Sequence, residues 1–96
     1  MLKILDKNTP ILMLEGSEPY KIVETVNEYI SNTDSKEITI DISHINLLDA
    51  CKISVLCSTE TYLKYPQHKI NWIVGSESVK LMTASMGLGN SSFIAN

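Results

Sequence analysis

The 96 residues suffice for one modest hydrophobic core and are too few for two, so we expect a single domain over residues 1–96. A hydrophobic content of 44%, with four glycines and three prolines, excludes a disordered chain. The net charge of -3 and the lack of a basic patch interleaved with aromatics argue against nucleic-acid binding. All eight basic residues are lysines, so the chain has no guanidinium fork for gripping phosphate or carboxylate groups.

The N-terminus has no long apolar core and no small-residue cleavage site, so no signal peptide is expected. No run approaches the roughly 18 apolar residues of a membrane span. Cys51 and Cys57 lie on one expected helix, where residues six apart point to different sides, and this disfavours a disulfide between them. We therefore expect a cytoplasmic protein with reduced thiols and no direct membrane insertion.

The chain opens with two short apolar runs, Leu2 to Leu5 and Ile11 to Leu14, separated by turn-forming residues. This pattern predicts a β-hairpin. Ser17 is expected to cap a helix that begins near Pro19, because proline is tolerated in the first turn. The buried stripe of that helix is expected to contain the apolar residues at helical spacing, namely Ile22, Val23, Val26, Tyr29 and Ile30.

Glu37 to Ile42 alternates and is rich in branched side chains, so it is expected to form a strand. A loop then leads to a second helix, expected over Ala50 to Tyr65, with Asp49 as its cap and Pro66 marking its end. The expected buried stripe of this helix contains Ile53, Leu56 and Leu63, flanked by Val55 and Tyr62.

Lys69 to Gly75 is expected to form another strand, followed by a third helix with Ser76 as its cap and Glu77 in its first turn. Gly87 is expected to end this helix as a left-handed residue, and Gly89 to Asn96 to form an edge strand or an ordered tail. The expected buried stripe of the third helix contains Val79, Met82 and Met86, with Leu81 beside them.

The expected order is therefore β-β-α-β-α-β-α, followed by either a last strand or an ordered tail. Strands that alternate with helices predict an α/β fold, with a mixed β-sheet and helices packed on it. In open α/β sheets, loops that leave the carboxyl ends of strands are where ligands and partners dock. The loop from Asp41 to Asp49 and the first turns of the second helix form the expected partner-binding surface, with residues His44, Asn46, Asp49, Ala50, Cys51, Lys52 and Ile53.

Cys51, at the expected start of the second helix with Lys52 beside it, has the setting of a redox or nucleophilic thiol. A small buried or half-buried cysteine is the favoured interpretation, because no Cys-x-x-Cys motif is present. His44, Asp49 and Cys51 are the only sequence-local set of metal-ligand types, and a loop histidine in solvent is favoured over a metal site. With no nucleophile–base pair or cofactor fingerprint, we expect a non-enzyme without cofactors or metals.

This order of elements resembles the STAS domain, the fold of bacterial anti-sigma-factor antagonists. Leu12-Met13-Leu14-Glu15-Gly16 is similar to the second strand of the family and its glycine. Ile38 to Ser43, followed by Leu47-Leu48-Asp49, is similar to the central strand and the loop that ends in aspartate. Val74-Gly75, with Leu81 to Gly89, is similar to the last strand–helix unit. The resemblance covers nearly the whole chain.

In the STAS family the loop aspartate is typically followed by Ser-Ser-Gly-Leu, and a partner kinase phosphorylates the first serine. Here Ala50-Cys51-Lys52-Ile53 follows Asp49, so the family position for phosphorylation holds Ala50, which has no hydroxyl. The resemblance thus implies a module in the regulation of transcription that binds an anti-sigma-type kinase or another regulatory protein without this switch. Two alternatives stay open: a STAS-like subunit of a larger assembly such as a lipid-transport complex, and a thiol-dependent or redox-sensing protein that uses Cys51.

Overall fold

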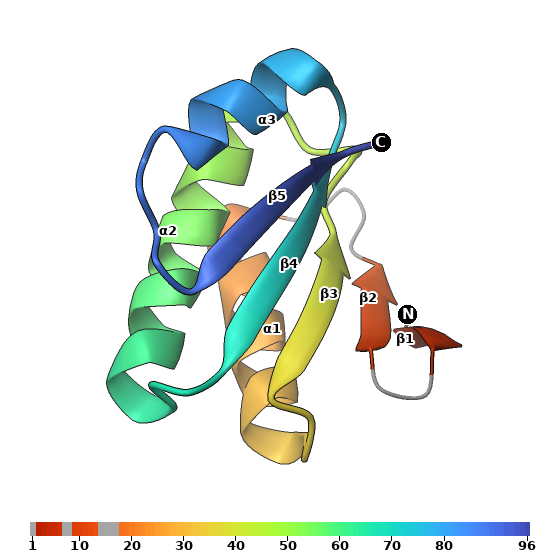
Figure 1. Ribbon diagram of the computed structural model, residues 1–96, viewed down its shortest axis with the longest axis vertical. Coiled ribbons are helices and arrows are strands. Elements are labelled where there is room, and N and C mark those ends of the chain that lie inside the picture. The colour runs from red at the N-terminus through yellow and green to blue at the C-terminus, as the bar shows by residue number, and fades with distance from the viewer. Residues whose placement is uncertain (1, 7–8, 14–17) are drawn as a thin grey trace.

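The computed structural model describes residues 2–6, 9–13 and 18–96, with side chains described from residue 18 onward. Its strands and helices confirm the expected order, and the C-terminal residues form a last strand rather than an ordered tail (Figure 1). In chain order they are β1 (Leu2–Asp6), β2 (Thr9–Met13), α1 (Pro19–Asn32), β3 (Glu37–Asp41), α2 (Leu47–Lys64), β4 (Lys69–Val74), α3 (Glu77–Ala84) and β5 (Ser91–Ala95).

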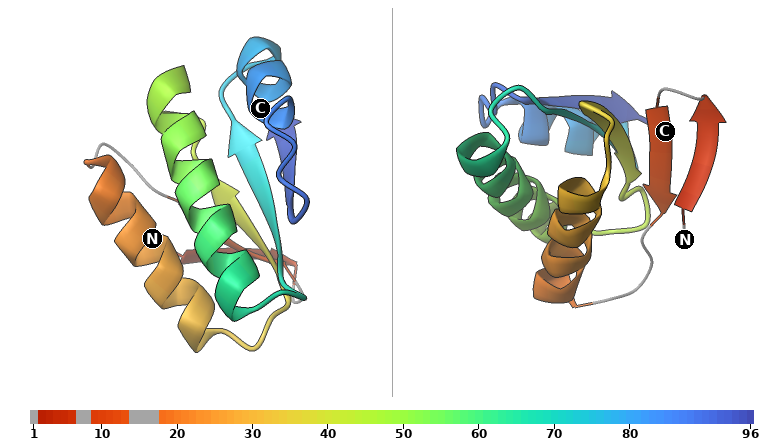
Figure 2. Two further views of the ribbon diagram at one scale, coloured as in Figure 1. Left: turned by 90° about the vertical axis from the view of Figure 1, so that its left-hand side faces the viewer. Right: turned by 90° about the horizontal axis from the view of Figure 1, so that it is seen from below.

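The described strands form one mixed sheet in the order β1-β2-β3-β4-β5. β1 and β2 are antiparallel, whereas β2, β3, β4 and β5 are parallel to one another. A helix joins each successive pair of parallel strands, as the crossover between parallel strands requires. Figure 2 shows α1, α2 and α3 on the same side of the sheet. The α/β class, the mixed sheet and the helical cover are therefore as expected.

The core lies between the sheet and the helices. The strands contribute alternate residues to it, since neighbouring side chains of a strand point to opposite faces. These buried strand residues are Ile38, Ile40, Ile70, Trp72, Val74 and Phe93. From α1 the core receives Ile22, Val26 and Ile30, with Val23 and Tyr29 partly buried, so the predicted stripe of α1 is confirmed.

The start of α1 differs in detail from expectation. The expected cap, Ser17, lies outside the described residues. Glu18 holds the cap position of the described helix, and its Oε1 accepts a hydrogen bond from the Tyr20 backbone N–H at 3.0 Å. Pro19 is the first helical residue, where its missing N–H costs no helical hydrogen bond.

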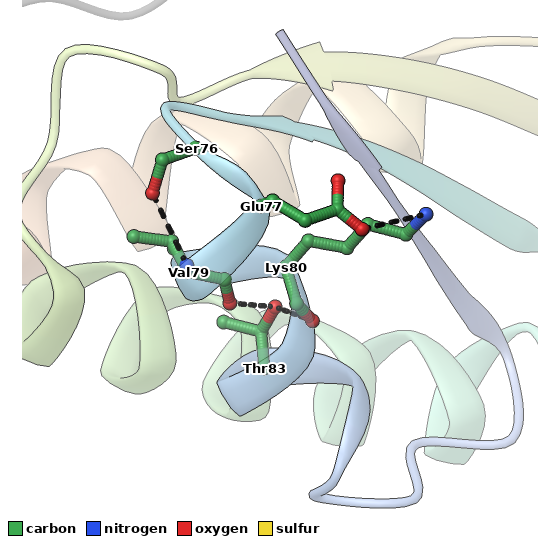
Figure 3. Close-up of polar contacts among 5 residues, drawn as sticks. All are labelled: Ser76, Glu77, Val79, Lys80 and Thr83. Carbon is green, nitrogen blue, oxygen red and sulfur yellow. Dashed lines mark hydrogen bonds and ion pairs between the residues drawn. The ribbon is translucent and has the colours of Figure 1, made fainter.

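α3 begins as expected. The Ser76 hydroxyl accepts a hydrogen bond from the Val79 N–H at 3.3 Å (Figure 3). Glu77 in the first turn suits the helix dipole and pairs with Lys80 at 3.8 Å. The buried hydroxyl of Thr83 donates to the Val79 and Lys80 carbonyl oxygens, so it needs no further partner in the core.

The predicted buried stripe of α3 is only partly right. Val79 and Met86 are partly buried, but Met82 is 55% exposed and Leu81 64% exposed. The reason is that α3 is short and directs Thr83 inward, which turns Met82 toward solvent. Beyond the helix, Gly87 has the expected left-handed conformation, with a φ of 69°.

Candidate functional site

The loop between β3 and α2 is held by short-range hydrogen bonds. The Asp41 carboxylate accepts a hydrogen bond from the Ser43 N–H at 2.9 Å, so this acid pairs within its own loop. The Ile45 N–H donates to the Ile42 carbonyl at 3.0 Å, and the Ile42 N–H donates to the Ile73 carbonyl of β4 at 2.9 Å. These bonds fix the direction in which the chain enters α2.

The expected start of α2 is wrong by one turn. Asn46 is its cap, with Oδ1 accepting a hydrogen bond from the Asp49 N–H at 2.9 Å. Asn46 Nδ2 in turn donates to Asp49 Oδ2 at 3.1 Å. Asn and Asp are equally good caps, and Asn46 holds the position because the tight loop brings the chain into the helix at Leu47. Asp49 therefore lies in the first turn, where its charge suits the dipole.

The seven predicted partner-binding residues are not all at the surface. His44, Asn46 and Lys52 are exposed, and Asp49 and Cys51 are half-buried. Ala50 and Ile53 are 0% exposed, so we correct the expected surface by removing them. Both belong to the core cluster together with the buried residues of the strands.

The predicted buried stripe of α2 is also wrong in two of its three members. Ile53 is buried, but Leu56 is 37% exposed and Leu63 is 72% exposed. The buried side of the helix consists mainly of small residues, namely Ala50, Ser54, Cys57, Ser58 and Thr61. Small side chains allow the helix to pack closely, and Ser54 satisfies its hydroxyl by donating to the Ala50 carbonyl at 2.8 Å.

The large apolar residues of α2 consequently lie on its outer side. We call this surface the α2 face, and define it by Leu48, Lys52, Val55, Leu56, Tyr62 and Leu63, all of which are exposed. Leu48 is 79% exposed near one end of the helix, and Tyr62 is 63% exposed near the other. Sequence reasoning missed this surface. A second stripe of small residues at helical spacing was the signal that could have revealed it.

The α2 face continues onto the first turn of α1 through Tyr20. Lys52 Nζ lies 5.5 Å from the centroid of the Tyr20 ring, within the range of a cation–π interaction. Tyr20 is itself 60% exposed. This interaction holds the ammonium group of Lys52 beside an otherwise apolar surface.

The two cysteines differ in environment. Cys57 is fully buried, and burial raises the pKa of its thiol to about 12. Cys51 is half-buried and free. Because α2 begins at Leu47, Cys51 lies beyond the first turn, away from the unpaired N–H groups that would stabilise a thiolate. The geometry therefore gives less reason to expect a reactive thiol at Cys51.

The C-terminal half of α2 borders two hollows. One, of about 230 Å³, lies between α1 and α2 and has residues of both charges in its wall, including Glu28, Glu60 and Lys64. Its cation is already paired, since Lys64 Nζ lies 2.7 Å from Glu60 Oε1, and this hydrogen bond raises the pKa of Lys64. The other, of about 490 Å³, lies between α2 and the loop from α3 to β5.

Residues 2–6, 9–13 and 18–96 contain no helix with the length and apolar character needed to cross a bilayer. The same part of the chain has no cluster of three or more His, Cys, Asp or Glu side chains that could hold a metal ion. Comparisons with protein-family models, with curated proteins and with solved structures find no match to this chain.

Proposed function

We propose that the protein is a non-enzymatic interaction module that binds a protein partner on the α2 face. The observation that carries this proposal is the reversed distribution of side chains on α2. A helix that served only the fold would place its large apolar residues toward the core. Here Leu48, Tyr62 and Leu63 face solvent while small residues face inward.

The dimensions of the α2 face suit a protein partner. Leu48 and Leu63 are separated by 15 residues, which spans roughly 22 Å along a helix. Each large apolar side chain covered by a partner contributes about 25 cal/mol per Å² of apolar area removed from water. Tyrosine is also enriched among residues that dominate binding energy, so Tyr62 is the expected centre of affinity.

The resemblance to STAS domains identifies the class of partner that we propose, an anti-sigma-type kinase or a related regulatory protein. The order of strands and helices agrees with that resemblance. The residue at the family position for phosphorylation, Ala50, has no hydroxyl and is 0% exposed. Binding would therefore proceed without the phosphorylation switch, and a serine introduced at this buried position would not be reached by a kinase.

The test is a titration against the purified ATPase-like kinase encoded nearest to this gene. Leu48→Glu and Leu63→Glu each place a charge on the α2 face and should weaken binding at least about tenfold, or 1.4 kcal/mol. The matched control is Ile94→Glu, which makes the same kind of change at an exposed residue on the helix-free side of the sheet. Failure of the wild-type chain to bind, or equal loss in the control, would overturn the proposal.

A permanent place in a larger assembly, such as a lipid-transport complex, is the second candidate. The observation in its favour is the further apolar surface on α3, the helix packed beside α2, where Leu81 and Met82 are exposed. Obligate interfaces are larger and more apolar than transient ones. A gene for a membrane permease beside this one would favour the assembly, and co-purification with the permease would be lost with Leu81→Glu.

A thiol-dependent or redox-sensing role for Cys51 is the third candidate and has less support. Cys51 is a free cysteine and is only half-buried. Its place beyond the first turn of α2 removes the helix-terminal stabilisation of a thiolate. If the Cys51→Ser variant still binds the partner, the protein is an interaction module and does not depend on this thiol.

A further inference from the structure

The groove of about 490 Å³ beside α2 has three walls. The end of α2 forms one wall with Ser58, Thr59, Tyr62 and Leu63. The turn after α2 forms a second wall with Pro66, His68 and Lys69, and the loop at residues 87–90 before β5 forms the third. Its volume lies within the range of small-molecule sites, about 300–1,000 Å³. The groove is therefore large enough for a small organic ligand.

A hydrogen-bonded network anchors the loop wall to the core. Asn90 Nδ2 donates to the Ser58 carbonyl at 2.9 Å. The Ser58 and Ser91 hydroxyls are hydrogen-bonded to each other, and the indole N–H of the buried Trp72 donates to the Ser91 hydroxyl at 3.0 Å. The wall is thus tied both to α2 and to the centre of the sheet, so the groove is formed before any ligand arrives.

Apolar side chains dominate the surface of the groove. Tyr62 and Leu63 contribute from α2, Pro66 from the turn and Leu88 from the loop. Tyr62 is 63% exposed and Leu63 72% exposed. A ligand with an apolar body would remove part of this surface from water, which is the favourable contribution that such sites use.

The basic side chains of the groove are Lys69 and His68, and none of the described residues that line it is an aspartate or a glutamate. Lys69 makes no ion pair within residues 18–96; its cross-strand neighbour Glu37 accepts a hydrogen bond from Asn71 at 2.8 Å instead. His68 packs against Tyr65, with the ring centroids 5.1 Å apart. Its Nδ1 is buried without a hydrogen-bond partner in that same range. In a chain of net charge -3, a lysine without an ion pair, in a groove with no acidic lining residue, favours an anion.

We infer that the groove binds a small amphipathic carboxylate. Its apolar body lies against Tyr62, Leu63 and Leu88, and its carboxylate lies at the Lys69–His68 end. The smaller hollow between α1 and α2 is a poorer match, because its lysine is paired and its wall carries Glu28 and Glu60. The groove shares Tyr62 and Leu63 with the α2 face. Leu48, at the other end of that face, lies outside the groove, 14 residues or roughly 21 Å along the helix from Tyr62.

The test uses decanoate as the probe, below its micelle-forming concentration, and follows the amide resonances of the full chain by NMR. Saturable shifts are expected in residues 58–63, 66–69 and 87–90. Decanol, which has the apolar body without the charge, and decyltrimethylammonium, which has the opposite charge, should both bind at least about tenfold more weakly.

Two variants locate the site. Lys69→Met removes the charge but keeps the aliphatic stem, and Leu63→Asp places a negative charge on the apolar wall; each should weaken decanoate binding about tenfold or more. Lys21→Met on α1 is the matched control and should bind like the wild-type chain. Leu48→Glu should also keep decanoate binding, although it is expected to lose the protein partner, so the two proposals can fail separately. No saturable shift, or equal affinity for all three probes, would overturn the inference.

Discussion

Gly75 lies against the backbone of Ser43. A Cβ atom on residue 75 would be 2.7 Å from the Ser43 carbonyl oxygen, closer than side-chain carbons approach a backbone oxygen. This contact joins the turn after β4 to the loop after β3, two segments far apart in sequence. Because the loop leads directly into α2, Gly75 helps to set where the helix begins.

Gly75→Ala should therefore destabilise the protein by about 1–3 kcal/mol, as expected when a methyl group is forced against backbone that cannot move aside. Gly89→Ala is the matched control, since a Cβ there has no atom within 4 Å. Gly89→Ala should change the free energy of unfolding by no more than about 1 kcal/mol. Urea unfolding of both variants measures the difference, and equal free energies of unfolding would show that the contact with Ser43 does not restrict residue 75.

The cap of α2 supplies a second prediction. Asn46→Ala removes the side-chain oxygen that accepts the Asp49 N–H, and should cost about 1 kcal/mol of stability. Asp49→Ala leaves that hydrogen bond to the backbone intact and should cost less, about 0.3–1 kcal/mol from the helix dipole. Thermal or urea unfolding separates the two variants. A larger loss of stability for Asp49→Ala than for Asn46→Ala would show that Asp49 caps the helix.

The order of elements could be predicted because each strand and helix has its own local signals. In α1, Ile22, Val26 and Ile30 recur on one side with charged residues opposite, so only one buried stripe is consistent with the pattern. Ser76 and Gly87 likewise lie where helix ends require such residues.

The buried side of α2 could not be predicted in the same way, because apolar residues occupy both of its sides. Ile53 belongs to the core, and Leu63 does not. Which side of α2 is buried depends on how closely the helix packs on the sheet, and this is a property of the tertiary structure. Close packing leaves room for small residues such as Ala50 and Cys57 and not for leucine. Of the residues expected at the surface, Lys52 is exposed, whereas Ala50 is buried because α2 packs closely on the sheet through its small residues.

The buried thiol of Cys57 predicts a loss of stability at alkaline pH. Burial raises its pKa in the folded protein from an ordinary value of 9.0 to about 12. Between these values the unfolded chain loses the proton while the folded chain keeps it, so the stabilising effect is complete below pH 9 and decreases as pH rises toward 12. The slope from this group is at most about 1.4 kcal/mol per pH unit.

Comparison with Cys57→Ala isolates this contribution, because tyrosines and lysines titrate in both proteins. The difference in free energy of unfolding between the wild-type chain and the variant should decrease above pH 9. A difference that stays constant up to pH 11 would show that the thiol is not the group responsible. In a separate measurement at pH 8, a thiol reagent should label the half-buried Cys51 in the folded chain and Cys57 only after unfolding.

The α2 face makes a prediction about stability as well as binding. If its large residues serve recognition, they contribute little to the fold, and Leu48→Glu or Leu63→Glu should change the free energy of unfolding by no more than about 0.5 kcal/mol. Ile53→Ala, on the buried side of the same helix, should cost about 2–5 kcal/mol. Urea unfolding of the three variants gives the comparison directly. A cost near that of Ile53→Ala at either leucine would mean that the residue supports the core, and the reversed distribution on α2 would then no longer argue for a partner.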